Sequence, residues 1–130
     1  MSVSEGFKLF VLDQLRDLEL LSTRRMFGAV AIYYDSLIFA LINDDNLYFK
    51  VGPENVEDYI KAGMSPFKPF EDKPMVMPYY EVPADVLESR KKLIQWVKKS
   101  YLASEASLTK KLEVKKRRER KRMAENNSQK

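Results

Sequence analysis

Hydrophobic side chains recur near the start of the chain with the spacing of an amphipathic helix. Apolar residues stand three and four positions apart between residues 7 and 21, and charged residues fill many of the positions between them. One face of such a helix packs on the protein while the other meets water. We therefore predict a helix over residues 4–21.

The following segments are rich in β-branched and aromatic residues, a composition typical of strands. They cover residues 26–34, 37–42 and 47–51. The breaks between them, at residues 35–36 and 43–46, are short and polar, which favours hairpins. We predict an antiparallel meander of three strands whose core face carries Phe27, Ile32, Phe39, Leu41 and Phe49.

The pattern changes again after this meander. Residues 54–62 have acidic side chains first and a lysine near the end, and glycine follows, as expected of a short helix. Prolines interrupt residues 64–74, which can be extended but do not suit a central strand. Residues 75–82 form a further candidate strand, and Pro83 opens a last long helix. The predicted order is α-βββ-α-β(β)-α, an α+β fold with helices packed on an antiparallel sheet.

The positive charge is concentrated at the C-terminal end. Residues 105–130 carry ten basic and four acidic side chains, a net charge of +6, so the first 104 residues are net −2 although the whole chain is +4. Apolar periodicity also ends near Leu102. We therefore expect one folded domain over residues 1–104 and a basic tail over residues 105–130, either an exposed helix or disordered.

Composition excludes several classes of chemistry, because the chain has no His and no Cys. Thiol nucleophiles, Cys- or His-bound zinc, iron–sulfur clusters and Ser-His-Asp triads all need those side chains. The carboxylates fall in turns and early helix positions, without the spacing of a metal loop or an acid–base pair. We expect no enzymatic activity, cofactor or metal. We also expect a cytoplasmic protein without membrane contact, since no leader pattern and no apolar run of ~20 residues is present.

Several motifs, in one order, resemble the N-terminal domain of the TfoX/Sxy family of bacterial competence regulators. They are Arg24-Arg25-Met26-Phe27-Gly28, Asp35 with Phe39-Ala40-Leu41, Leu47-Tyr48-Phe49-Lys50-Val51, Pro66-Phe67, Met77-Pro78-Tyr79-Tyr80-Glu81-Val82-Pro83 and the helix that carries Trp96. The resemblance covers about residues 7–103. The family commonly has a second glycine where this chain has Ala29, and a second helical domain where this chain has its basic tail. The resemblance implies a standalone form with a secretion-chaperone-like α+β fold and a role in regulating competence genes.

Five residues of the first domain are candidates for contact with an anion or a partner: Arg24, Arg25, Lys50, Tyr79 and Tyr80. The two arginines either clamp a phosphate or carboxylate, or one of them pairs with the acidic surface of the first helix. Lys50 either joins that anion site or deters pairing at a sheet edge. Because neighbouring strand residues face opposite sides, we expect one tyrosine in the core. The other is exposed, where it meets a protein partner or stacks on a base.

Seven cations of the tail are candidates for contact with nucleic acid: Lys115, Lys116, Arg117, Arg118, Arg120, Lys121 and Arg122. No aromatic residue lies among them, so they would contact phosphates without sequence preference. The alternative is a solvated tail that keeps the protein soluble.

Two functions follow. One is a non-enzymatic interaction module that regulates competence or other genes, whose partner is a transcription factor or a second copy. The other is a general protein-binding or dimerising, chaperone-like domain with no DNA role.

Overall fold

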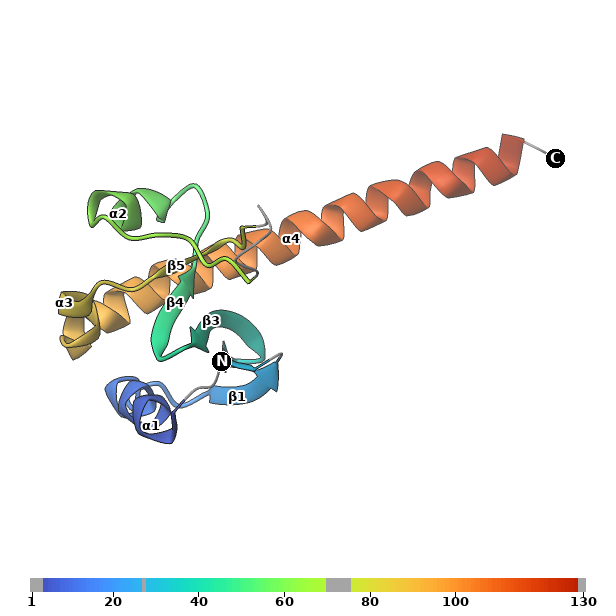
Figure 1. Cartoon of the computed structure of the whole chain (residues 1–130). Coiled ribbons are helices and arrows are strands. Elements are labelled where there is room, and N and C mark those ends of the chain that lie inside the picture. Colours follow the sequence, from blue (N-terminus) through green and yellow to red (C-terminus); the bar gives the residue numbers. More distant parts are fainter. Residues whose placement is uncertain (1–3, 27, 70–75, 129–130) are drawn as a thin grey trace.

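The computed structural model describes residues 4–26, 28–69 and 76–128. Its elements are α1 (Glu5–Gln14), β1 (Leu21–Met26), β2 (Ala29–Tyr34), β3 (Leu37–Asn43), β4 (Asn46–Lys50), α2 (Val56–Lys61), β5 (Tyr79–Glu81), α3 (Ala84–Leu87) and α4 (Arg90–Ser128). The five strands form one sheet in sequence order, and every neighbouring pair is antiparallel. Figure 1 shows the helices packed around this sheet and α4 projecting beyond it. The predicted α+β class is confirmed.

The first helix is shorter than predicted: turns follow it over residues 15–20, and a strand begins at Leu21, the last residue of the predicted helix. Ser4 caps α1 by accepting a hydrogen bond from the Phe7 N–H, and the helix ends at Gln14. The segment Leu21–Met26 instead pairs along its whole length with β2. Its backbone groups thus find partners in the sheet, so the stretch between the predicted helix and the first predicted strand is itself a strand. The meander before α2 therefore has four strands rather than three.

A β-bulge in β3 decides which side chains reach the core. Ile32 is paired with Ala40 and Tyr33 with Ile38, which leaves Phe39 as the extra residue. An extra residue reverses the alternation of faces along a strand. Phe39 therefore packs in the main core, whereas Leu41 lies on the opposite side of the sheet.

Three of the predicted core residues, Ile32, Phe39 and Phe49, are buried together as expected. The prediction for Leu41 was wrong because the bulge was not visible in the alternation of the sequence. Phe27 lies outside the described residues.

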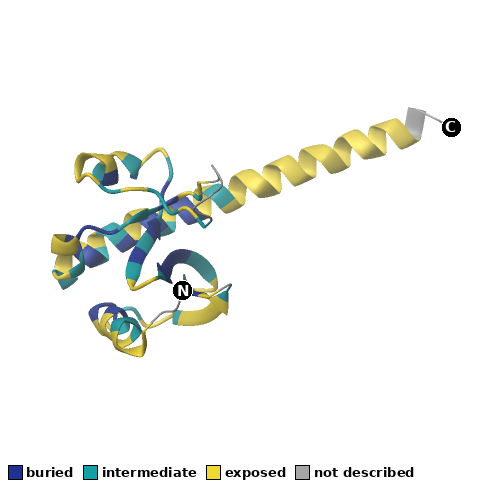
Figure 2. Ribbon diagram, in the orientation of Figure 1, coloured by how far each residue is buried: buried dark blue, intermediate teal, exposed yellow. Residues whose placement is uncertain are grey.

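The sheet has two differently covered faces, which we call the core face and the second face. All four helices contribute to the core face through Val11, Tyr59, Val86, Leu93 and Val97. The second face centres on three buried residues, Ala31, Leu41 and Tyr79. Around them lie the half-buried side chains of Met26, Tyr33, Ile38, Tyr48, Phe67 and Met77. Figure 2 shows the buried residues gathered where sheet and helices meet.

The proline-containing stretch after α2 pairs with the last strand. The Glu81 N–H donates to the Ser65 carbonyl at 3.1 Å, and the Phe67 N–H donates to the Tyr79 carbonyl at 2.7 Å. The extended conformation predicted for this stretch is thus observed at its beginning, next to β5. The strand predicted over residues 75–82 is limited to Tyr79–Glu81, and residues 70–75 lie outside the described residues.

The last predicted helix is divided at Ser89. The Ser89 hydroxyl accepts a hydrogen bond from the Lys92 N–H, which caps the start of α4 after the short α3. From Arg90 the helix continues through 39 residues, a length of about 58 Å at 1.5 Å per residue. The described side chains from residue 108 onward are all exposed, as Figure 2 shows. The tail is thus helical as far as Ser128, with its side chains exposed over residues 108–126, and the division of the chain at Ser104 stays a prediction.

Candidate functional site

Strand register places three of the predicted site residues on the second face. Arg24 lies opposite Ala31 across β1 and β2, and Lys50 lies opposite Tyr79 across β4 and β5. Residues directly opposite each other in an antiparallel pair share a face of the sheet. Because Ala31 and Tyr79 belong to the second face, Arg24 and Lys50 lie on it as well.

The other two candidates lie on the core face. Arg25 is opposite Val30 and Tyr80 is opposite Phe49, and both of these partners are core residues. Arg24 and Arg25 therefore leave β1 on opposite sides, which does not suit a clamp made by both guanidiniums. Within the described part of the chain, no ion pair joins either arginine to α1.

The prediction that one of the two tyrosines is exposed was wrong. Tyr79 is only 5% exposed and Tyr80 is half-buried, with its ring 5.9 Å from that of Tyr59. They do face opposite sides of the sheet as expected, but both sides are covered at this point. The sequence could not show that residues of the loop before β5, such as Phe67 and Met77, pack on the second face.

The side chain of Lys50 lies over the ring of Tyr79. The Lys50 ammonium lies 5.2 Å from the centre of the Tyr79 ring, within cation–π range. Burial raises the pKa of Tyr79 to about 12, and the nearby Tyr33 adds to the increase. The phenol is therefore neutral at physiological pH, so this contact is a lysine on an aromatic ring rather than an ion pair.

The tail helix brings a second positive charge to Lys50. Partial burial lowers the pKa of Lys50, and the charge of Lys111 in α4 lowers it further. The end of β4 lies against α4, where Gly52 faces Ala103, so two cations from distant parts of the sequence act on each other there, and neither has an acidic partner at ion-pair distance among the described residues. Such an arrangement suits an anion.

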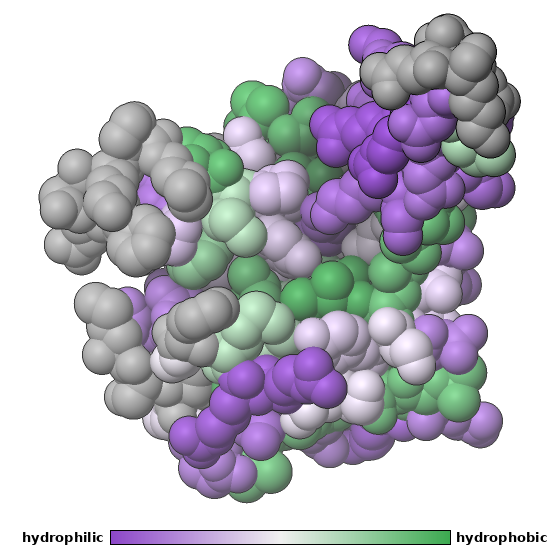
Figure 3. Space-filling model, turned by 90° about the vertical axis from the view of Figure 1, so that its right-hand side faces the viewer, coloured by the Kyte–Doolittle hydropathy of each residue, from purple (hydrophilic) through white to green (hydrophobic). Residues whose placement is uncertain are grey.

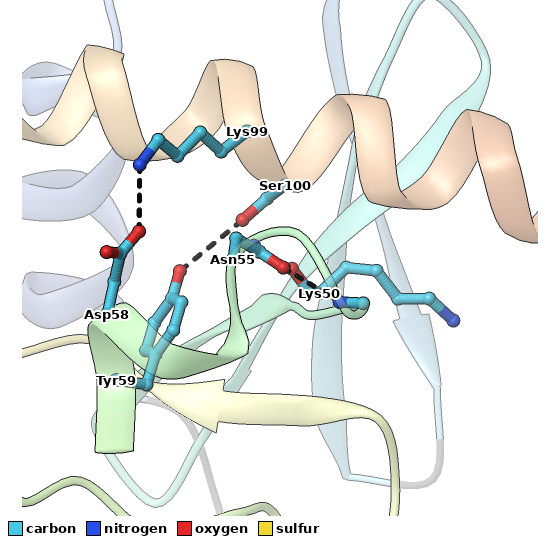
Figure 4. A network of polar contacts seen from close by, with 7 residues as sticks. Lys50, Asn55, Asp58, Tyr59, Lys99 and Ser100 are labelled. Atoms are coloured by element: carbon cyan, nitrogen blue, oxygen red, sulfur yellow. Dashed lines mark hydrogen bonds and ion pairs between the residues drawn. The ribbon is translucent and has the colours of Figure 1, made fainter. Parts of the chain in front are cut away.

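Asn55, which sequence reasoning missed, fixes the end of β4 where Lys50 lies. Its side chain is 1% exposed. The amide oxygen accepts from the Gly52 N–H at 2.7 Å, and the amide nitrogen donates to the Lys50 carbonyl at 3.1 Å (Figure 4). An asparagine just after Gly-Pro at a strand end was the available signal, because short polar side chains commonly satisfy backbone groups in turns.

Contacts between α2 and α4 add to the packing of α4 on β3, β4 and α3. Tyr59 lies 3.4 Å from the Ser100 hydroxyl, and Lys99 donates to Asp58 at 2.9 Å (Figure 4). The Tyr59 ring also meets the Trp96 ring edge-on at 4.7 Å. Burial raises the pKa of Tyr59, an effect that the bond to Ser100 partly offsets. We call residues 4–104 the body. Because α4 is one continuous helix, these anchors help to set the angle at which its cationic half leaves the body.

The buried face of α4 continues into the tail as a cationic face. Leu93, Val97, Ser100 and Ser104 are buried and stand three or four residues apart. The same spacing leads on through Ser107 to a shallow, open groove along one side of the exposed helix. The groove is lined by Lys110, Lys111, Lys115, Arg118 and Arg122, together with Ser107, Val114 and Glu119. We call Lys111, Lys115, Arg118 and Arg122 the inner cations.

Comparison with known protein families supplies the identity of the body. The family model for the TfoX N-terminal domain matches residues 13–104. The chain belongs to the TfoX N-terminal domain family. A comparison with curated proteins finds no match. The resemblance inferred from the motifs is thus confirmed, over a range that includes Arg24, Lys50 and Tyr79.

The match to the family model ends where the burial of α4 ends. Ser104, the last residue of the match, is also the last described residue of α4 that is buried. The candidate cations of the tail therefore lie outside the part of the chain that the family model covers.

Two further properties of this TfoX N-terminal domain concern the described residues alone. None of their helices combines the length and the apolar composition needed to cross a bilayer. They also contain no cluster of three or more His, Cys, Asp or Glu side chains suited to a metal ion.

Proposed function

We propose that this TfoX N-terminal domain protein is a non-enzymatic interaction module that acts in the cytoplasm in the control of gene expression, with competence genes as the expected targets. Membership of the family supports the regulatory role. The single observation that carries the interaction is the exposed cationic half of α4. Nine of the ten basic residues of the tail lie between Lys110 and Arg122.

Nucleic acid is the partner that this charge distribution fits best. A localised field of +6 on a helix attracts a polyanion, whereas the body at net −2 repels one on average. The tail has no aromatic side chain to stack on bases, so its contacts are with phosphates and do not depend on sequence. A partner protein such as a transcription factor would then supply the choice of gene.

Changing the seven candidate cations of the tail to glutamine is expected to abolish DNA binding. If about five of them meet phosphates on a duplex, log K falls against log salt with a slope of roughly −4 to −5. The dissociation constant at physiological salt is then about 10⁻⁴–10⁻⁶ M, the range of non-specific contact. Fluorescence anisotropy with two unrelated duplexes across a salt series measures both quantities.

A variant in which the same seven positions exchange Lys for Arg and Arg for Lys is the control, because it keeps the charge and should keep the affinity. Binding that persists in the glutamine variant, or that prefers one duplex, would contradict the proposal.

A second candidate function is self-association, and a specific surface favours it. An apolar groove of about 280 Å³ lies beside the point where α4 leaves the body, lined by Leu18, Tyr34, Val97, Lys98, Tyr101 and Leu102. Desolvation and the negative charges of Glu105 and Asp35 raise the pKa of Tyr101, so acidic groups stand near this groove. The basic tail of a second copy complements the nearby acidic groups by its charge, and its exposed Leu108 and Leu112 complement the apolar lining of the groove.

The self-association candidate predicts a dimer in light scattering coupled to gel filtration. Leu108 and Leu112 cannot reach the groove of their own chain, because α4 is one continuous helix. Changing Leu108 and Leu112 to glutamine is expected to give a monomer. Val114→Gln, which alters the cationic groove of the tail instead, should leave the dimer intact. A wild-type chain that stays monomeric at about 100 μM, a concentration well above typical dissociation constants, would eliminate this candidate.

A further inference from the structure

We propose that the nucleic acid lies in the angle between α4 and the second face of the sheet, with its phosphates on Lys50 and the inner cations. This inference rests on the proposed function and specifies the face that carries it. The alternative is that the tail binds as a free polycation, in which case all sides of the helix contribute alike.

The first support is the continuity of the two faces of α4. The side that is buried in the body becomes the groove-lining side of the tail, where five cations stand against one acid, Glu119. The groove begins at Ser107, three residues after the buried Ser104, so a ligand that fills it lies next to the point where α4 leaves the body. A ligand on the opposite side of the helix would touch the tail alone.

The second support is the position of Lys50 beside α4: Gly52, two residues after it, faces Ala103 of that helix, and the charge of Lys111 acts on Lys50. Each charge disfavours the other, and partial burial of Lys50 removes some of the water that would screen them. A phosphate placed between the two ammonium groups reverses this repulsion. The site therefore gains more from an anion than two isolated surface lysines would.

The third support is the composition of the second face. A row of residues crosses the sheet from Arg24 through Ala31 and Leu41 to Tyr48. The row continues from Tyr48 to Glu81 in β5, so a cation at one edge of the sheet and an acid at the other flank an apolar middle. Figure 3 shows a band of hydrophobic residues on the body beside the hydrophilic end of the tail helix. A low-dielectric wall next to cations strengthens their field in the space between.

The dimensions agree with this arrangement. The inner cations from Lys111 to Arg122 extend along about 16 Å of helix at 1.5 Å per residue. This length corresponds to roughly five base steps at 3.4 Å of rise per step. It accommodates about as many phosphates as the salt dependence proposed above requires.

The tail offers a matched pair of variants for the test. One changes the inner cations to glutamine: Lys111, Lys115, Arg118 and Arg122. The other changes four cations that do not line the groove, namely Lys116, Arg117, Arg120 and Lys121. Each variant removes two lysines and two arginines, and all eight side chains are exposed, so neither substitution removes buried contacts. Circular dichroism verifies that both retain the helix.

Fluorescence anisotropy with a duplex of about 16 base pairs, across a salt series, gives the result. We expect the variant without the inner cations to bind DNA at least about tenfold more weakly than the variant without the four other cations. It should also reduce the slope of log K against log salt by roughly 3 to 4. We also expect Lys50→Gln to weaken binding severalfold and Lys61→Gln, on α2, to leave it unchanged. Equal losses in the two tail variants, with no effect of Lys50→Gln, would overturn this inference while the proposed function stands. Unchanged binding in both tail variants would overturn the inference and the proposed function together.

Discussion

Replacing Phe39 by alanine is expected to lower the free energy of unfolding by about 3–5 kcal/mol, the usual range for removing a buried aromatic ring. Phe39 has no solvent exposure, and its ring lies 5.7 Å from that of Phe49. It is also the extra residue of the bulge in β3, and the bulge turns its side chain into the core. Urea denaturation followed by circular dichroism measures the change.

Ile38→Ala is the control for this prediction, because it removes a half-buried side chain from the second face of the same strand. Its cost should be clearly smaller than that of Phe39→Ala. A loss below about 1 kcal/mol for Phe39→Ala, with a larger loss for Ile38→Ala, would show that the bulge lies elsewhere and that the two faces of β3 are exchanged.

The elements predicted well are those whose signals are local. Short polar breaks mark the β2–β3 and β3–β4 turns, and the composition of residues 54–62 marks α2. The turns use positive φ at Asp35 and Ser36 and at Asp44 and Asp45, which short polar residues adopt more readily than bulky ones do. Such features depend only on neighbouring residues, so a single sequence reveals them.

The elements predicted badly depend on partners far along the chain. The segment Leu21–Met26 is mostly polar, and only its pairing with β2 makes it a strand. The bulge at Phe39 likewise arises from how β2 and β3 fit together. Neither pairing leaves a mark in the local pattern, which is why β1 and the position of Leu41 were both missed.

The candidate site shows the same limit. Sequence reasoning considered Arg24 and Arg25 as one clamp because they are adjacent, and the period of a strand separates them onto opposite faces. It kept Lys50 apart from the tail, yet the end of β4 lies against α4, where Gly52 faces Ala103. Register and helix direction assemble the site, and both are properties of the folded chain.

A second large loss of stability is expected at the contact between α2 and α4. Tyr59→Ala is expected to lower the free energy of unfolding by about 3–5 kcal/mol, because the ring is 1% exposed and fills the space between α2 and α4. It should also shift the emission of Trp96 to longer wavelength. Trp96 is the only tryptophan of the chain, and its edge-on contact with Tyr59 at 4.7 Å shields it from water.

Tyr59→Phe separates the packing of the ring from its polar contact. This variant keeps the ring against Trp96 and loses only the hydroxyl that lies 3.4 Å from Ser100, so its cost should be about 0.5–1.5 kcal/mol with little change in emission. Chemical denaturation and the emission spectrum of each folded variant provide the two readings. If Tyr59→Ala costs no more than Tyr59→Phe and leaves the emission of Trp96 unshifted, then the α2–α4 contact does not hold the tail helix. The fixed angle on which the proposed DNA site depends would then lose one of its main supports.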